Sequence, residues 1–298
     1  MELSFAALLA GFSLKGATRR QTPAALQKTP LLIAHRGGAG LAPENTMDAF
    51  RQAVDLWQAD MIELDVHATK DGRCVVIHDP TVDRTTNGTG RVADLTYAEL
   101  RELDAGYHFT ADYKRTYPFR GKGVTIPTIE DVLEAVPDIP LIVEVKTGAA
   151  QKPLFEAIAK FNAADRVIVA GMYDRDRTLF GGYGGPISAS SEQVTEFYRF
   201  FAMRLGKYWS LNADVVQVPE HHGSRRIVTQ KFVKALHDQG IPVHVWTVNH
   251  ESDMHRLYDW GVDGLVTDRP DVLCRVLNRR VHRPLPPGAE QEPTVGSL

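Results

Sequence analysis

Two histidines, an arginine and a pair of carboxylates stand where buried strands are expected to end. His35 and Arg36 follow one apolar run, Glu63 and Asp65 lie two residues apart in a second, and His78 ends a third. Strand side chains two residues apart point to the same face, so both carboxylates can reach one cation. Histidine exchanges protons near neutral pH, and carboxylate oxygens suit Mg²⁺ or Ca²⁺. The pattern therefore predicts metal-assisted acid–base chemistry.

A tight turn is expected to return His78 to this pair of carboxylates. The second and third apolar runs are joined by Lys70-Asp71-Gly72, and so short a link joins antiparallel strands. If the loop consists of two residues, the pairing register places His78 opposite Asp65. The hairpin is therefore predicted to bring an imidazole beside a carboxylate.

The apolar runs and the helices between them predict a (β/α)₈ TIM barrel, in which the carboxyl ends of all strands meet at one mouth. The third run is excluded from the ring because its turn makes it antiparallel. A strand near Glu144 adds another carboxylate to the mouth, and a divalent cation would relieve the repulsion among the three. The eight predicted parallel strands end at His35, Asp65, Lys146, Met172, Ser190, Pro219, Asn249 and Asp268.

Length alone allows one large α/β barrel or two ordinary domains, and the eight runs favour the barrel. With 298 residues, 43% hydrophobic residues and a net charge of −3, the chain can bury a full core and shows no basic excess for nucleic-acid binding. We expect an apolar segment and connector at 1–30 and the barrel at 31–277. An insertion over the mouth is expected at 79–128, and a mobile tail at 278–298. The sequence does not determine the oligomeric state.

The first twelve residues are apolar apart from Glu2 and Ser4 and are too few to cross a bilayer. A secretory signal carries basic residues before its apolar core, whereas Lys15, Arg19 and Arg20 follow this run. The segment is predicted either to pack on the barrel or to make a weak contact with a membrane surface. A cytoplasmic location, free or membrane-peripheral, is expected, with export as the alternative.

Several motifs along residues 31–277 resemble the glycerophosphodiester phosphodiesterase family, in order and in spacing. They are His35-Arg36-Gly37, Pro43-Glu44-Asn45-Thr46, Glu63-Leu64-Asp65-Val66, Val76-Ile77-His78-Asp79-Pro80, Asp83-Arg84-Thr85-Thr86-Asn87-Gly88, Glu144-Val145-Lys146, Trp246-Thr247-Val248-Asn249 and the run from Asp263 to Pro270.

The resemblance implies a TIM barrel with one divalent cation, Mg²⁺ or Ca²⁺. It implies that Glu63, Asp65 and Glu144 are the metal ligands and that His35 and His78 are the acid–base pair. Which histidine is the acid and which the base stays open.

Four further residues are candidates for substrate binding. Arg36 offers a planar fork for phosphate oxygens, and Lys146 offers a point charge. Glu44 either orients Arg36 or serves as a carboxylate at a helix N-terminus. Trp246 either packs in the core or lines the substrate pocket.

The implied reaction is metal-dependent hydrolysis of a glycerophosphodiester to sn-glycerol 3-phosphate and an alcohol. A neighbouring hydroxyl of the substrate is expected to attack phosphorus and give a cyclic phosphate. The alternative is lysophospholipase D-type or phospholipase C-like cleavage of a lipid phosphodiester, including lysophospholipids, and the insertion is expected to select the head group. A glycoside hydrolase would leave the histidines and Lys146 without roles, and a non-catalytic phosphate- or lipid-binding barrel would leave the acid–base pair unused.

Overall fold

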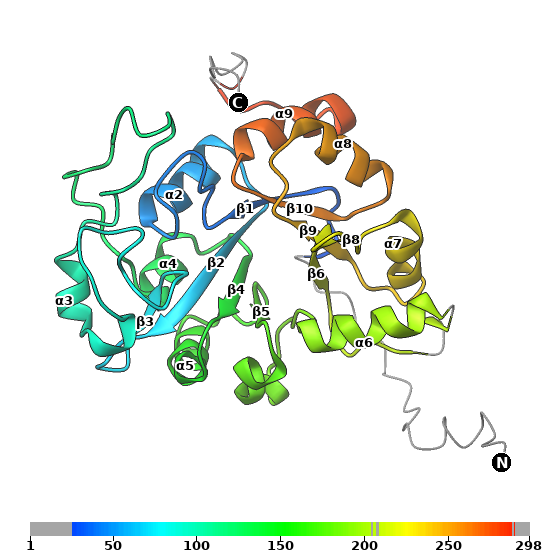
Figure 1. Ribbon diagram of the computed structural model, residues 1–298, viewed down its shortest axis with the longest axis horizontal. Coiled ribbons are helices and arrows are strands. Elements are labelled where there is room, and N and C mark those ends of the chain that lie inside the picture. Colours follow the sequence, from blue (N-terminus) through cyan, green and yellow to red (C-terminus); the bar gives the residue numbers. More distant parts are fainter. Residues whose placement is uncertain (1–25, 204, 207–208, 288, 290–298) are drawn as a thin grey trace.

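The computed structural model describes residues 26–203, 205–206, 209–287 and 289. Its central feature is a ring of parallel strands, in the order β5-β4-β2-β1-β10-β9-β6. Figure 1 shows these strands at the centre of the molecule with helices around them. The strands are β1 (Leu31–His35), β2 (Met61–Ala68), β4 (Leu141–Val145), β5 (Val167–Ala170), β6 (Val216–Pro219), β9 (Val243–Trp246) and β10 (Gly264–Thr267).

The eighth position of the ring is occupied by a very short stretch at residues 187–188. Ile187 pairs in parallel with Val169 of β5, and Ser188 pairs in parallel with Val215, the residue before β6. The backbone N–H of Ser188 donates to Val169 O at 3.0 Å, and that of Ala189 donates to Val215 O at 2.9 Å. These bonds on both sides close the ring, and the predicted TIM barrel is confirmed.

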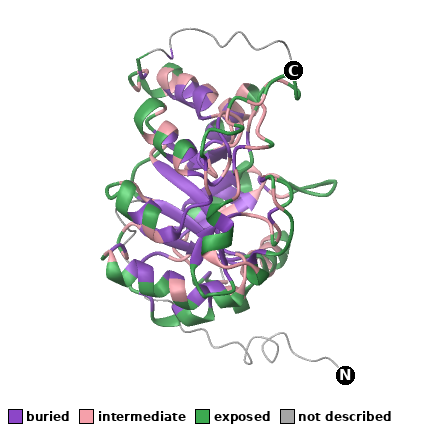
Figure 2. Ribbon diagram, turned by 90° about the vertical axis from the view of Figure 1, so that its left-hand side faces the viewer, coloured by how far each residue is buried: buried purple, intermediate pink, exposed green. Residues whose placement is uncertain are grey.

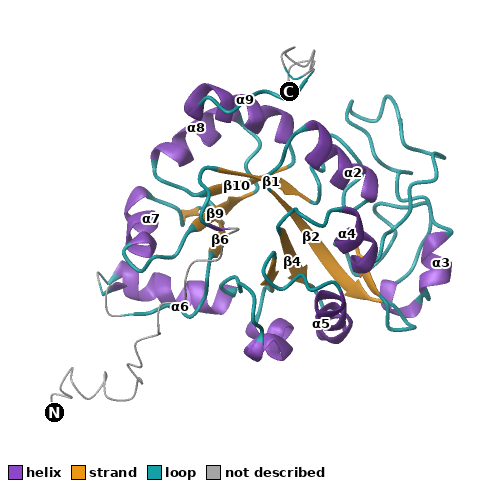
Figure 3. Ribbon diagram, turned by 180° about the vertical axis from the view of Figure 1, so that it is seen from behind, coloured by secondary structure: helices purple, strands orange, loops and turns teal. Residues whose placement is uncertain are grey.

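Helices cover the outside of the barrel, as Figure 3 shows from behind. Several begin directly after a threonine, because Thr46, Thr128 and Thr229 accept a hydrogen bond from a backbone N–H of the first turn. The α-helices are α2 (Met47–Arg51), α3 (Tyr97–Arg101), α4 (Ile129–Ala135), α5 (Gln151–Lys160), α6 (Ser191–Ala202), α7 (Gln230–His237), α8 (Glu251–Asp259) and α9 (Pro270–Val281). A π-helical turn, η2 (Gln52–Leu56), continues α2, and short 3₁₀ turns are η3 (Val92–Asp94), η4 (Gly148–Ala150) and η5 (Asp174–Gly182).

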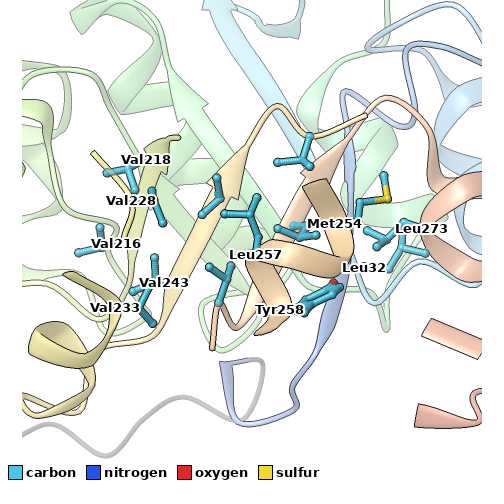
Figure 4. Packing of buried hydrophobic residues seen from close by; sticks show 14 of the residues in the cluster. Leu32, Val216, Val218, Val228, Val233, Val243, Met254, Leu257, Tyr258 and Leu273 are labelled. Carbon is cyan, nitrogen blue, oxygen red and sulfur yellow. The ribbon is translucent and has the colours of Figure 1, made fainter. Parts of the chain in front are cut away.

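The strands are buried, and exposed residues lie mainly on the outer faces of the helices and on the loops (Figure 2). One large apolar layer fills the space between strands and helices. In it, Val243 of β9 packs near Val233 of α7 and Leu257 of α8 (Figure 4). A second set of side chains fills the inside of the barrel, where Leu26 is buried with Ile33 of β1. The barrel interior is thus a packed core below its mouth.

Gly264 is required where β10 and β9 approach each other. A Cβ at this position would lie 2.8 Å from Cδ2 of His244 and 2.9 Å from Cδ1 of Ile33, both buried. Gly264→Ala is therefore expected to destabilise the fold by about 1–3 kcal/mol through overpacking. The measurement is urea unfolding beside Gly181→Ala, whose Cβ would meet open space. Equal midpoints for the two variants would show that the barrel absorbs the extra methyl group.

The hairpin exists, but its predicted register is wrong by one residue. β3 (Cys74–Val76) pairs antiparallel with β2, and Val66 faces Val76. Thr69 closes a three-residue loop, because its N–H donates to Arg73 O at 2.9 Å and Gly72 adopts φ 79°. Ile77 therefore lies opposite Asp65, with Ile77 N donating to Asp65 O at 3.0 Å. His78 is therefore one residue past the position opposite Asp65 that was predicted for it.

The insertion at 79–128 lies between β3 and α4 and has a small core of its own. Val82, Leu100 and Ile126 are buried there against Val75 of β3. It contains the short helix α3, which Thr96 caps. The segment thus extends the outside of the hairpin.

The two ends of the chain are described only in part. The N-terminal apolar segment, and with it the predicted membrane contact, falls in residues 1–25, outside the described residues. α9 continues past the predicted boundary at residue 278 to Val281, and Arg283 then donates to Asp60 Oδ2 at 2.5 Å. Among the described residues, no helix has both the length and the apolar character needed to cross a bilayer.

Candidate active site

A pocket opens at the carboxyl ends of the strands and collects almost all of the predicted site residues. Its charged wall comes from β1, β2, the end of β3 and β4, and its other wall from β5, residues 188–191 and β9. Glu44 is the predicted site residue that does not line it. The predicted residues that do line it are His35, Arg36, Glu63, Asp65, His78, Glu144, Lys146 and Trp246.

Three carboxylates from neighbouring strands form a compact cluster in this pocket. One oxygen each from Glu63, Asp65 and Glu144 lies within 4.8 Å of the others. The strand pairing produces this arrangement, since Asp65 of β2 is directly opposite Glu144 of β4. Glu63 and Asp65 lie on the same face of β2, as predicted, because side chains alternate between the two faces of a strand.

The cluster carries more negative charge than its neighbours neutralise. Lys146 Nζ lies 2.9 Å from Asp65 Oδ1 and 2.9 Å from Glu144 Oε2. Glu63 Oε2 accepts a hydrogen bond from the backbone N–H of Arg36 at 3.0 Å. Burial and the charge of Asp65 nevertheless raise the pKa of Glu63 to about 8. This set of carboxylate oxygens with excess negative charge, on the buried Asp65 and the partly buried Glu63 and Glu144, fits a divalent cation.

The raised pKa of Glu63 predicts a pH-dependent stability for the metal-free protein. Between about pH 4.5 and 8 the folded state holds a proton on Glu63 that the unfolded chain has lost, so the free energy of unfolding should fall as pH rises. Chemical unfolding in chelator at pH 5 and pH 8 measures this. Glu63→Gln cannot ionise and should show a smaller loss; an equal loss in wild type and variant would contradict the assignment.

His35 is held from behind by a pair of residues at the ends of β9 and β10. Its Nδ1 lies 2.6 Å from Asp268 Oδ1, and Asn249 Nδ2 donates to Asp268 Oδ2 at 2.8 Å. Burial lowers the pKa of His35, but the hydrogen bond to Asp268 and the charge of Glu63 outweigh it, and the pKa is raised. The Nε2 atom lies 3.9 Å from Glu63 Oε2, on the side of the carboxylate cluster.

His78 is held in the same way by the residue that follows it. Its Nδ1 lies 2.7 Å from Asp79 Oδ1. A carboxylate at Nδ1 favours the proton on that nitrogen and leaves Nε2 for the pocket. The one-residue shift of the hairpin therefore leaves His78 in the pocket lining, although it does not pair with Asp65.

Arg36 and Glu44 form an ion pair beside the cluster. Arg36 Nη1 donates to Glu44 Oε1 at 2.8 Å, and Arg36 Nε lies 3.3 Å from Asp65 Oδ2. Glu44 is absent from the pocket lining, and its assignment to substrate binding stays a prediction. Its contact with Arg36 agrees with the predicted role of orienting that residue.

Trp246 and Met172 add large apolar side chains to a lining that otherwise mixes small apolar and polar residues. Trp246 and Met172 line the pocket and remain 39% and 42% exposed, so Trp246 is not a core residue. Among the described residues, none from the insertion lines this pocket. Selection of the head group by the insertion thus stays a prediction.

Four polar residues that hold the site together were not predicted as site residues. They are Asp79, Arg84, Asn249 and Asp268. All four belong to the motifs that carry the family resemblance, and Asn249 and Asp268 also stand at predicted strand ends. A polar residue at the end of a barrel strand was therefore an available signal.

Two imidazoles, an arginine and a lysine surround a carboxylate cluster at the mouth of a TIM barrel, a combination suited to the hydrolysis of phosphate esters. The sequence model described as "glycerophosphoryl diester phosphodiesterase family" matches residues 35–272. The chain belongs to this family, and it is an enzyme of the phosphoric diester hydrolase class.

Relatives and solved structures agree with this membership. A glycerophosphodiester phosphodiesterase of Caldanaerobacter subterraneus is 35% identical over 84% of this chain and 98% of its own. The human lysophospholipase D GDPD1 is 31% identical over 81% of this chain and 84% of its own. A phosphodiesterase of Oleispira antarctica in complex with the product sn-glycerol-3-phosphate superposes with a TM-score of 0.70 at 22% identity, covering 85% of this chain and 99% of that one.

Proposed function

We propose that the protein hydrolyses glycerophosphodiesters to sn-glycerol 3-phosphate and an alcohol. The observation that carries this proposal is the pair of imidazoles, each bound through Nδ1 to an aspartate, beside three clustered carboxylates in one pocket. The name of the Caldanaerobacter relative and the product bound to the Oleispira structure support the same substrate class.

Glu63, Asp65 and Glu144 would hold one divalent cation, Mg²⁺ or Ca²⁺. When bound, the cation supplies a Lewis acid for a phosphoryl oxygen and offsets the charge of the carboxylates. Lys146 already lies between two of these carboxylates, so it can hold their geometry and present its charge to the phosphate.

The histidines would transfer protons on the two sides of the phosphodiester. A neighbouring hydroxyl of the glycerol attacks phosphorus and gives its proton to one imidazole, while the other imidazole protonates the departing alcohol. Water then opens the cyclic phosphate with the two proton transfers reversed. Asp268 and Asp79 stabilise whichever imidazole is charged, and Arg36 binds a non-bridging oxygen of the phosphate.

A second candidate substrate is a lysophospholipid, cleaved in the manner of a lysophospholipase D. The exposed Trp246 and Met172 favour it, because they form an apolar wall beside the charged one. The cavity, of about 210 Å³, accepts a glycerophosphate group, so an acyl chain would extend past this wall. The name of the human relative points to the same chemistry.

The experiment compares glycerophosphocholine, lysophosphatidylcholine and an aryl glycoside, with and without a chelator. Cation-dependent release of choline from glycerophosphocholine is the expected result. Faster turnover of lysophosphatidylcholine would favour the lipid substrate. Hydrolysis of the glycoside alone, or of none of the three, would contradict the proposal.

A further inference from the structure

Arg84 lies outside the pocket lining but binds two carboxylates, each of which contacts a residue of that lining. Its Nε donates to Asp79 Oδ2 at 2.6 Å, while its Nη1 and Nη2 donate to Glu44 Oε2 at 2.6 Å and Glu44 Oε1 at 2.8 Å. The guanidinium thus uses its rigid fork on one carboxylate and its remaining N–H on the other. Asp79 follows the hairpin, whereas Glu44 precedes α2, so Arg84 connects two separate elements.

Each of these carboxylates in turn holds one of the groups expected to act on the substrate. Asp79 Oδ1 lies 2.7 Å from His78 Nδ1, and Glu44 Oε1 accepts from Arg36 Nη1 at 2.8 Å. A continuous chain of hydrogen bonds therefore runs from an imidazole, through Arg84, to the arginine of the phosphate site. Such side-chain networks are stronger and more rigid than separate pairs.

Hydrogen bonds from Arg84 lower the pKa of both carboxylates. Burial raises the pKa of Asp79, but hydrogen bonds from Arg84 and His78 bring it down to about 2. Burial likewise raises the pKa of Glu44, and its hydrogen bonds to Arg84 and Arg36 outweigh that effect and lower it. Without Arg84, Asp79 and Glu44 would lose the cation that links them, and the positions of His78 and Arg36 would no longer be tied to each other through it.

We propose that Arg84 is a positioning residue that fixes His78 and Arg36 relative to each other, through Asp79 and Glu44. This inference rests on the proposed function, because the reactive roles of His78 and Arg36 come from it. Arg84 itself is 48% exposed at the side chain, so its replacement is expected to leave the barrel core undisturbed.

The kinetic test uses Arg84→Ala, Arg84→Lys and, as a matched control, Arg91→Ala at an exposed arginine of the same insertion. With glycerophosphocholine, kcat/KM of Arg84→Ala should be about 10- to 100-fold lower than that of wild type. The reason is that His78 and Arg36, once misplaced, lose contacts with the transition state. Lysine cannot span both carboxylates, so kcat/KM of Arg84→Lys should lie between the values of Arg84→Ala and wild type. The control should match wild type.

A double-mutant cycle separates positioning from a merely structural role. In the background of Asp79→Asn with Glu44→Gln, the further change Arg84→Ala should cost less than about twofold, because its partners are already lost. Added guanidinium should restore activity to Arg84→Ala but not to the triple variant. An undiminished cost in that background, or the absence of any cost in wild type, would overturn the proposal.

The ring nitrogens of His78 give a readout that needs no turnover. In wild type, ¹⁵N NMR should show neutral His78 as one tautomer with its proton on Nδ1, and Arg84→Ala should show a mixture. Unchanged signals would overturn the proposal even if the wild-type enzyme proved inactive on glycerophosphocholine. Inactive wild type with changed signals would instead count against the proposed function alone.

Discussion

Replacement of either His35 or His78 by alanine is expected to lower kcat by on the order of a hundredfold or more, with little change in folding. Each imidazole is bound at Nδ1 by an aspartate and lies in the lining of the same pocket, so neither can substitute for the other. Both lie at the mouth, where side chains contribute to chemistry more than to the core. Steady-state kinetics with glycerophosphocholine measure the effect.

Control variants for the histidines come from the same chain. His237 is an exposed histidine paired with Asp263 at 2.7 Å and lies outside the pocket lining. His237→Ala should therefore keep wild-type kcat. Near-normal turnover of His78→Ala would show that a one-residue shift in the hairpin has removed this histidine from the chemistry.

Removal of divalent cations is expected to abolish turnover while leaving the barrel folded. Glu63, Asp65 and Glu144 cluster at the mouth, whereas the apolar core forms without them. Circular dichroism in chelator should match that of the loaded protein, and added Mg²⁺ or Ca²⁺ should restore activity. The ion that restores turnover at the lower concentration identifies the preferred metal.

Substitutions of the carboxylates proposed to bind the cation test the same expectation residue by residue. Asp65→Asn removes a buried charge that both Arg36 and Lys146 face, so it should weaken cation binding and turnover together. Binding of the metal alone is measured by calorimetry. Undiminished turnover of Glu63→Ala or Asp65→Ala in chelator would remove the metal from the mechanism.

The parts of the site that depend on local pattern were predictable from the sequence. The apolar run before His35 predicts β1, and the alternation in β2 places Glu63 and Asp65 on one face. The mouth of a TIM barrel then predicts that Glu144 joins them, because all strands deliver their carboxyl ends to one side. These steps need only periodicity and a fold class.

The register of the hairpin could not be predicted in the same way. Two- and three-residue loops fit the same sequence, and the choice moves every pairing by one position. The longer loop occurs because Thr69 Oγ1 accepts from Arg73 N at 2.9 Å and Gly72 takes a positive φ. Neither detail appears in the apolar pattern.

Asp268 and Arg84, which support the site from outside the pocket, were missed for a related reason. Asp268 lies 233 positions from His35 in the sequence, and the two meet because β10 pairs with β1 when the barrel closes. Arg84 reaches Glu44 across 40 positions. Pairing across such distances depends on the assembled ring, so residue type and spacing could identify the candidates but not their partners.

The most direct measurement follows phosphorus during turnover of glycerophosphocholine by ³¹P NMR in ¹⁸O-labelled water, with the cation present. The diester signal should be replaced by that of glycerol 3-phosphate carrying ¹⁸O on phosphorus, while choline is released. His35→Ala should convert the diester more slowly by about a hundredfold or more. Appearance of phosphocholine and glycerol would contradict cleavage of the bond between phosphorus and the choline oxygen. Conversion by His35→Ala at the wild-type rate would contradict catalysis at this site.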